Sequence, residues 1–396
     1  MTAMMDESLP PMASRQGGGP WGFLLTVFIG CMNNAPLMTA RLILPMIAMQ
    51  AGASPGFVGL IAAMFTALPI VFNVGFGRWV DRSGTLVPMV LASLLIGVAS
   101  LLPILWGRPA MLLAMAGLIG CGTVFSHVAT TRAVGEIGPP EQRTRNLGLL
   151  IAAYSVFQFV GPMVAGVTLE HYGKDWAVLS IGTFAVLALC GLMLPGHLFT
   201  CWTTLRDAAA ARPRIRELVR VPSLMRWLAV SSVTSSVVTI FPFIVALHAA
   251  EIGMSASQAG LALGAFAIGT VVSRLLTGPI SRHVRAHVAI SAMLGVGAIL
   301  YAALPAMAGF ASFAALNAAL GLVLGMSVPF VLSVIYSVAP PRRVNEAIGL
   351  SMTLTNVIQT LMPLGLGLLA ARLGGAVMSW MLALLMLGAI GLSRKP

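Results

Sequence analysis

The sequence predicts an all-α membrane protein whose twelve transmembrane helices form two pseudo-symmetric halves of six helices each. Its 396 residues are 58% hydrophobic and only 9% charged, whereas about a quarter of residues are charged in soluble proteins. Apolar stretches of roughly 20 residues, long enough to cross a bilayer as a helix, recur along the chain. A constant internal repeat then divides these stretches into two equal sets.

Each apolar stretch is interpreted as one membrane span because short polar segments separate it from its neighbours. The expected spans are 21–49, 55–76, 86–106, 110–132, 146–169, 176–195, 223–250, 257–277, 288–306, 310–336, 347–371 and 376–392. The longest polar stretch, with five arginines, is expected to link the halves at the cytoplasmic membrane surface. The expected organisation is a cytoplasmic tail, a first bundle, the basic linker, a second bundle and a short cytoplasmic tail: 1–20, 21–195, 196–222, 223–392 and 393–396.

The internal repeat has an offset of 201 residues and is clearest where EIGPPEQRTRNLGLL (136–150) aligns with SVAPPRRVNEAIGLS (337–351). The same offset pairs further identical residues: Ser54 with Ser255, Gly59 with Gly260, Gly77 with Gly278, Gly120 with Gly321, Gln158 with Gln359, Pro162 with Pro363, Gly166 with Gly367, and Gly173 with Gly374. An unbroken offset over this length predicts two halves in parallel register, a plan typical of certain secondary transporters.

The basic residues predict the orientation of the chain. If the N-terminus is cytoplasmic, 18 of the 23 Lys and Arg residues fall in or beside cytoplasmic segments. The positive-inside rule therefore predicts that both termini lie inside the cell, with the chain in the inner (plasma) membrane. Nucleic-acid binding is not expected despite the net charge of +12, because the basic residues lie singly or in pairs in short loops. The four cysteines have no shared spacing, so neither a disulfide framework nor a metal site is expected. No cofactor is expected either.

The stretch GRWVDRSG (77–84), between the second and third spans, resembles the signature loop of the major facilitator superfamily, Gly-x-x-x-Asp-Arg-x-Gly-Arg-Arg. The matching residues are Gly77, Asp81, Arg82 and Gly84. The two basic residues that usually follow are replaced by Thr and Leu. The resemblance implies a transporter in which these residues form a conformational latch. A carboxylate at Asp81 can accept hydrogen bonds from helix N-terminal amides or pair with a basic side chain, and so favour one conformation.

A second stretch, VGPMVAG (160–166), partly resembles the Gly-Pro-x-x-Gly-Gly motif in span five of the family's exporters. The residues that match are Gly161, Pro162 and Gly166, while alanine replaces the first glycine of the closing pair. This resemblance favours export of a small organic solute by alternating access. The alternatives are an uptake permease or facilitator for a small organic anion or metabolite and, more distantly, a channel or a non-transporting membrane sensor.

Polar residues within the spans are candidates for a substrate cavity, because polar groups in the bilayer need partners and often face a wet site. The candidates are Asn33, Asn34, Arg41, His127, Gln158, His248, Asn356 and Gln359. Arg41 and His127 would give the cavity a positive potential, which favours an anionic substrate. In the rival interpretation Arg41 extends to the membrane surface and His127 is a neutral packing residue, leaving an apolar cavity for neutral compounds. No acid lies within an expected span, which argues against proton coupling through a carboxylate in the membrane. Protons are kept as an alternative for the coupling ion.

An enzyme is not expected. The stretch GASPG (52–56) fits Gly-x-Ser-x-Gly, but no strand precedes it. Its serine, Ser54, is shared by the repeat as Ser255, and a serine before an apolar run is better interpreted as a helix N-cap. No Walker A sequence is present either. The expected partners are a small-molecule substrate and the lipid bilayer, and the expected state is a monomer.

Overall fold

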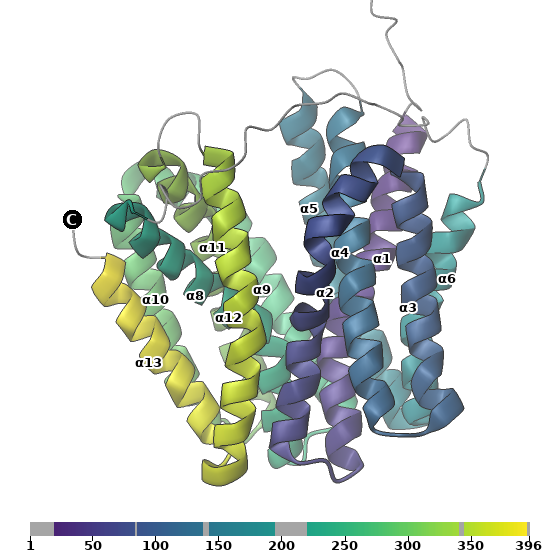
Figure 1. The fold of residues 1–396 in the computed structure, drawn as a ribbon. Coiled ribbons are helices and arrows are strands. Elements are labelled where there is room, and N and C mark those ends of the chain that lie inside the picture. The colour runs from purple at the N-terminus through teal and green to yellow at the C-terminus, as the bar shows by residue number, and fades with distance from the viewer. Residues whose placement is uncertain (1–19, 84, 138–141, 195–219, 340–343, 394–396) are drawn as a thin grey trace, which may run out of the picture.

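The computed structural model describes residues 20–83, 85–137, 142–194, 220–339 and 344–393. For some of these residues, 71–83 among them, it describes the backbone alone. Its described part contains twelve α-helices and one 3-10 turn, and no strand (Figure 1). The helices are α1 (Pro20–Gln50), α2 (Pro55–Ser83), α3 (Leu86–Trp106), α4 (Ala110–Glu136), α5 (Arg143–Tyr172), α6 (Lys174–Leu192), α8 (Pro222–Glu251), α9 (Ala256–His283), α10 (Ala286–Ala303), η3 (Leu304–Ala306), α11 (Phe310–Val338), α12 (Val344–Leu373) and α13 (Ala376–Ser393). The predicted all-α class is confirmed.

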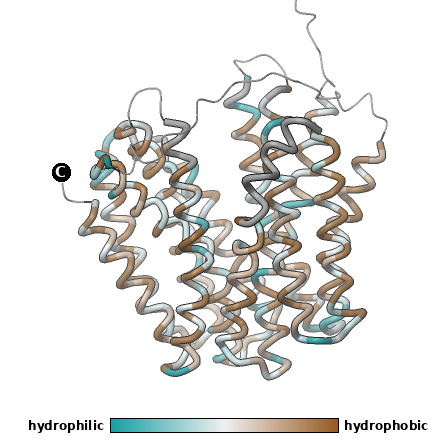
Figure 2. Tube along the Cα trace, in the orientation of Figure 1, coloured by the Kyte–Doolittle hydropathy of each residue, from teal (hydrophilic) through white to brown (hydrophobic). Residues whose placement is uncertain are grey.

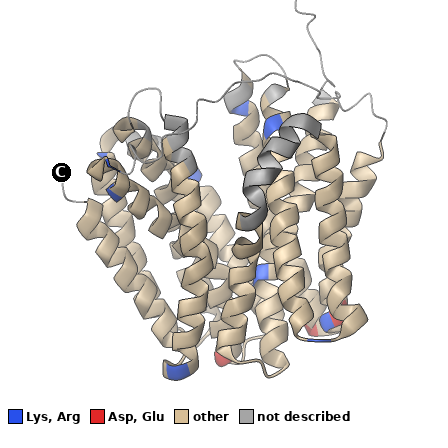
Figure 3. Cartoon of the chain, viewed as in Figure 1, with Lys and Arg blue, Asp and Glu red and all other residues tan. Residues whose placement is uncertain are grey.

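Eleven of these helices are long and apolar enough to cross a membrane, and α2 contributes a shorter apolar stretch, Pro55–Ile70, among its described side chains. Hydrophobic residues follow most helices along their length (Figure 2). Charged residues gather mainly at the two ends of the bundle (Figure 3). The basic linker falls almost entirely outside the described residues. Its location at the cytoplasmic membrane surface therefore stays a prediction.

The interpretation of GRWVDRSG as a loop is wrong for most of its length, because α2 continues through it to Ser83. Likewise α9 extends beyond its apolar run to His283. Hydropathy marks where a helix leaves the hydrocarbon, but the backbone hydrogen bonds can continue into the polar region. Gly84 lies outside the described residues, and the structure describes only the backbone of Gly77, Asp81 and Arg82.

The repeat is visible in the turns and caps of the two halves. Gly173 and Gly374, one offset apart, both have left-handed backbone angles, with φ of 86° and 87°. Ser255 forms a capping box with Gln258 at the start of α9. At the start of α2, the Ser54 hydroxyl accepts the backbone N–H of Phe57 at 3.3 Å. Both serines therefore cap helices, as predicted.

The two halves meet through the pairs α2–α12 and α5–α9. We call the face where residues 20 and 393 lie the inner face, and the opposite face the outer face. The closest packing lies toward the outer face and obeys the repeat. A Cβ at Gly59 would lie 2.6 Å from the carbonyl oxygen of Pro363, and one at Gly260 would lie 2.8 Å from that of Pro162. Only glycine allows these backbones to approach so closely. We call this close packing of α2 against α12 and of α5 against α9 the outer contact.

Candidate substrate-binding site

A large cavity lies between the two halves and is lined by α1, α5, α8, α9 and α11. Its volume is about 1560 Å³, including open space at its mouth. Its wall runs from the middle of these helices toward their inner ends, for example from Pro162 to Ile151 on α5 and from Leu263 to Thr277 on α9. The outer contact lies at the other ends of the same helices. The cavity therefore faces the inner side, and the helices close it on the outer side.

The wall of this central cavity is mostly apolar, with side chains such as Leu263, Phe266 and Pro242. Its polar groups include Ser155 and Gln158 on α5, which share one helical face as the i, i+3 spacing predicts. Arg274 of α9 reaches across to α5, where its guanidinium donates hydrogen bonds to the Ser155 hydroxyl at 2.6 Å and to the Ile151 carbonyl at 3.1 Å. Arg274 therefore joins the two halves within the cavity wall instead of extending only to the membrane surface.

A narrow pocket adjoins the central cavity, because Thr239 of α8 lines both. Its empty space is about 350 Å³ when the open space at its mouth is included. Arg41 of α1 lines this pocket together with Thr66, Ser236 and Gln359. We call it the Arg41 pocket. The Arg41 side chain is 8% exposed, and its guanidinium carbon lies 5.8 Å from the centre of the Phe65 ring. Arg41 therefore lies inside the bundle, between the halves.

A row of polar contacts joins α8 to α12 beside this pocket. Ser351 donates to Ser231 at 3.2 Å and Thr355 donates to Ser232 at 3.1 Å. One turn further, the amide of Gln359 donates to the Thr239 hydroxyl at 2.9 Å. The spacing of four residues along α12 keeps these donors on one face. Several hydroxyls of α8 thus bond to another helix, whereas a helical hydroxyl often bonds only to its own backbone.

The motif in span five lies at the outer contact. A Cβ at Gly161 would collide with the Thr39 hydroxyl of α1, and one at Gly166 would lie 2.5 Å from the Ala256 carbonyl oxygen of α9. Pro162 supplies the carbonyl oxygen that faces Gly260. The three residues of the motif therefore serve close packing of α5 against α1 and α9.

A charged group adds to one side of the outer contact. Glu170, near the end of α5, accepts the backbone N–H of Ser257 at 3.0 Å and also bonds to the Ser257 hydroxyl. A carboxylate at the first turn of α9 is favoured by the helix dipole. The residues one offset away are Ala371 and Gly56, which cannot form this contact. Among the described side chains, the carboxylate that caps a helix of the other half is therefore found on the α5–α9 side of the outer contact.

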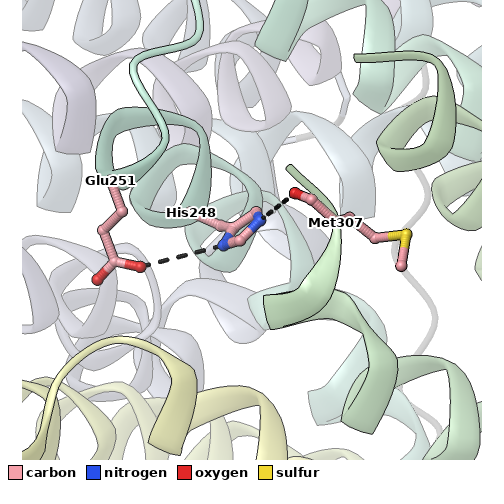
Figure 4. Close-up of polar contacts among 3 residues, drawn as sticks. All are labelled: His248, Glu251 and Met307. Atoms are coloured by element: carbon pink, nitrogen blue, oxygen red, sulfur yellow. Dashed lines mark hydrogen bonds and ion pairs between the residues drawn. The ribbon is translucent and has the colours of Figure 1, made fainter. Parts of the chain in front are cut away.

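Some of the predicted cavity residues lie elsewhere. Asn33 is fully buried within the first half, where its amide oxygen accepts a hydrogen bond from Ser93 at 3.0 Å. His248 lies near the outer end of α8, with Nε2 3.0 Å from the Met307 carbonyl oxygen and Nδ1 4.0 Å from a carboxylate oxygen of Glu251 (Figure 4). It joins α8 to the connection between α10 and α11. Neither residue lines the central cavity or the Arg41 pocket.

The remaining candidates flank the site. Asn34 is half-buried one turn before Met38, which lines the central cavity. Asn356 is half-buried one turn before Thr360, whose hydroxyl lies 3.0 Å from that of Thr66 in the other half. His127 is exposed on α4, with its ring 5.6 Å from the ring of Tyr154, and it lines neither cavity. Gln158 and Gln359 thus both reach the site, one in each cavity, as the repeat suggested.

Two important groups were missed as site residues. Ser236 and Thr239 lie in an expected span that is rich in serine and threonine, and nothing in the sequence of that stretch separates them from their neighbours. Glu170 is the residue that follows the expected span 146–169, and it is not among the predicted site residues. Its role depends on Ser257, which lies 87 residues away, and no local pattern marks such a pair. The repeat could have indicated the α5–α9 contact, since it aligns the glycines there.

Two halves of six helices around a shared internal cavity define a membrane transporter. The profile of the Major Facilitator Superfamily matches residues 23–247 and 226–394, and the chain belongs to this superfamily. The members of this superfamily are membrane transporters. The family match therefore indicates that the chain is a transporter and not an enzyme.

Among curated proteins, the chain is similar to Multidrug resistance protein 1 of Bacillus subtilis (strain 168), with 27% identity over 117 residues. The match spans 30% of each protein. Among solved structures, it resembles a POT family transporter in complex with a thioalcohol-conjugated peptide (TM-score 0.74, 11% identity, 94% of both chains). It also resembles a bacterial homologue of the human lysosomal transporter Spinster in an inward-facing and occupied conformation (TM-score 0.71, 12% identity, 94% of this chain and 95% of the other). At these identities the structures support the fold alone.

Proposed function

We propose that this protein is a secondary active transporter that moves a small organic solute across the inner membrane by alternating access. The observation that carries this proposal is the central cavity, which lies between the halves, is open toward one face and is closed by the outer contact at the other. A solute could bind from the inner face here. Separation of the outer ends and closure of the inner ends would then release it on the other side.

We propose further that both termini are cytoplasmic, so that the described conformation faces the cytoplasm. The positive-inside distribution of the basic residues supports this orientation. A cavity open to the cytoplasm suits a transporter that collects its substrate there. The placement of Pro162 and Gly166 at the outer contact, with Gly161 packed beside it against α1, and the partial similarity to Multidrug resistance protein 1 favour export over uptake.

The coupling ion is part of the same proposal. None of the acidic residues whose side chains are described lines the central cavity or the Arg41 pocket. A proton relay normally needs a titratable group in the path. We therefore expect that a pH gradient is not essential for exchange of substrate across the membrane.

Transport in sealed vesicles tests this proposal. The purified chain should be reconstituted and supplied with a panel of neutral, anionic and cationic aromatic compounds, with and without a pH gradient. We expect saturable transport of at least one class, and counterflow when a second substrate is loaded on the opposite side. Uptake that rises linearly without saturation for every compound would instead indicate a channel, and no transport of any compound would contradict the proposal.

A further inference from the structure

The Arg41 guanidinium is a buried positive charge that has no partner of opposite sign among the described side chains. In the described part of the chain it forms no hydrogen bond and no ion pair, and its one noted contact is the face of the Phe65 ring. No acidic side chain lines the pocket that it faces. An uncompensated charge in such a place is unfavourable for folding, so it is expected where a ligand supplies the opposite charge.

The same pocket contains a second unsatisfied group. The Ser236 hydroxyl of α8 has no hydrogen-bond partner in the described part of the chain, although Ser236 is only 1% exposed. Ser236 and Thr239 lie on one face of α8, since they are three residues apart, and both line the pocket with Arg41. Buried hydroxyls nearly always have partners. Arg41 and Ser236 therefore offer unused donors toward one small volume.

The rest of the surroundings is apolar and indicates the body of the ligand. The Arg41 pocket is completed by side chains such as Ile240, Phe243 and Met362. Through Thr239 it adjoins the larger, mostly apolar central cavity. The two volumes thus differ in charge and size. The Arg41 pocket is small and offers donors to a single negative group, and the central cavity is large and suits an apolar group.

We propose that the substrate is an amphipathic organic monoanion, whose carboxylate binds Arg41 and Ser236 in the Arg41 pocket while its apolar body occupies the central cavity. This inference rests on the proposed function and names its substrate class. A guanidinium can form two parallel hydrogen bonds with a carboxylate, and the Ser236 hydroxyl can donate a third. Arg274, in the cavity wall, adds positive potential that favours an anion.

Calorimetric titration of the purified full-length protein tests the proposal with three matched probes. These are 4-phenylbutyrate, 4-phenylbutyramide and 4-phenylbutylamine, which share one apolar body and differ in the head group. We expect the acid to bind at least about tenfold more tightly than the amide, and the amine to bind most weakly. A tenfold change in Kd corresponds to about 1.4 kcal/mol.

Three variants locate the preference. Arg41→Gln should abolish the preference for the acid over the amide, whereas binding of the amide should stay within about twofold. Ser236→Ala should weaken binding of the acid by about 3- to 10-fold, equivalent to one hydrogen bond. Arg372→Gln removes the same charge from an exposed position in the last turn of α12 and should bind all three probes like the wild type.

The thermal unfolding of the ligand-free variants separates a binding role from a structural one. We expect Arg41→Gln to unfold at the same temperature as the wild type or higher, because it removes an unpaired buried charge. If Arg41→Gln does not fold, Ser236→Ala decides, and unchanged binding of the acid in that variant overturns the proposal. Equal binding of acid and amide by the wild type, tighter binding of the amine, or a retained preference in Arg41→Gln also overturns it. Because binding is measured without vesicles, anion binding without transport would contradict the proposed function and leave this inference intact.

Discussion

Substitution of Gly367 tests whether the outer contact closes the cavity. Gly367 of α12 packs against α2, where a Cβ would lie 2.9 Å from the Pro55 carbonyl oxygen and 2.9 Å from the Gly59 Cα. Ordinary contacts of a Cβ lie at 3.4–4 Å. In Gly367→Ala the two helices must therefore separate by about 0.5–1 Å, or lose favourable contacts nearby. Overpacking of this kind costs about 1–3 kcal/mol.

This cost applies only to the conformation in which the outer ends are in contact. The variant should therefore shift the equilibrium toward the outward-open conformation by about 5- to 150-fold. Gly365→Ala is a matched control, because Gly365 lies on the same helix and has no atom within 4 Å of its added Cβ. Both substitutions raise helix propensity by about 1 kcal/mol, so this effect is common to both variants and cancels in the comparison.

The shift can be measured by cysteine labelling. A reporter Thr66→Cys substitution, with the four native cysteines replaced by serine, places a thiol where Thr66 now faces Thr360 across the halves. An impermeant thiol reagent added from the outer side should label Gly367→Ala about 5- to 150-fold faster than the parent. Gly365→Ala should label at the parental rate. Equal labelling rates in the two glycine variants would show that this contact does not close the cavity.

Three further predictions concern the latch, the cap and the orientation. Asp81→Asn should slow or abolish transport with near-normal expression, because it changes the balance of conformations more than folding; transport at the wild-type rate would contradict the latch. In the Thr66→Cys reporter, Glu170→Gln should speed labelling from outside, because it weakens the cap on Ser257. Glu251→Gln leaves that contact intact and should label like the parent. Equal labelling rates in the two variants would show that Glu170 is a solvated charge without a gating role. Single cysteines should report both termini inside, and reversed labelling would overturn that orientation. Positions expected to react from outside are Pro55, Gly173 and Gly309. Positions expected not to react are Thr85, Arg212 and Pro340.

The sequence by itself determined the fold, because the signals for the fold are local or periodic. Apolar length marks each membrane helix. The offset of 201 residues then paired the glycines of the two halves, and the structure places these pairs at equivalent contacts, as with Gly59 and Gly260. The two capping serines were also predictable, since an N-cap depends only on the next few residues.

Only the tertiary structure decided which polar residues meet. Asn33 and Arg41 lie in the same span, but Asn33 bonds within the first half to Ser93, and Arg41 faces the pocket between the halves. The rotation of α1 about its own axis decides which residue faces which neighbouring helix. Hydropathy says little about that rotation when every face of a helix is apolar. The same limit hid Ser236 among similar hydroxyls. Its lack of a partner is a property of the packed bundle, because a hydrogen bond is satisfied or unsatisfied only once the neighbouring helix is in place.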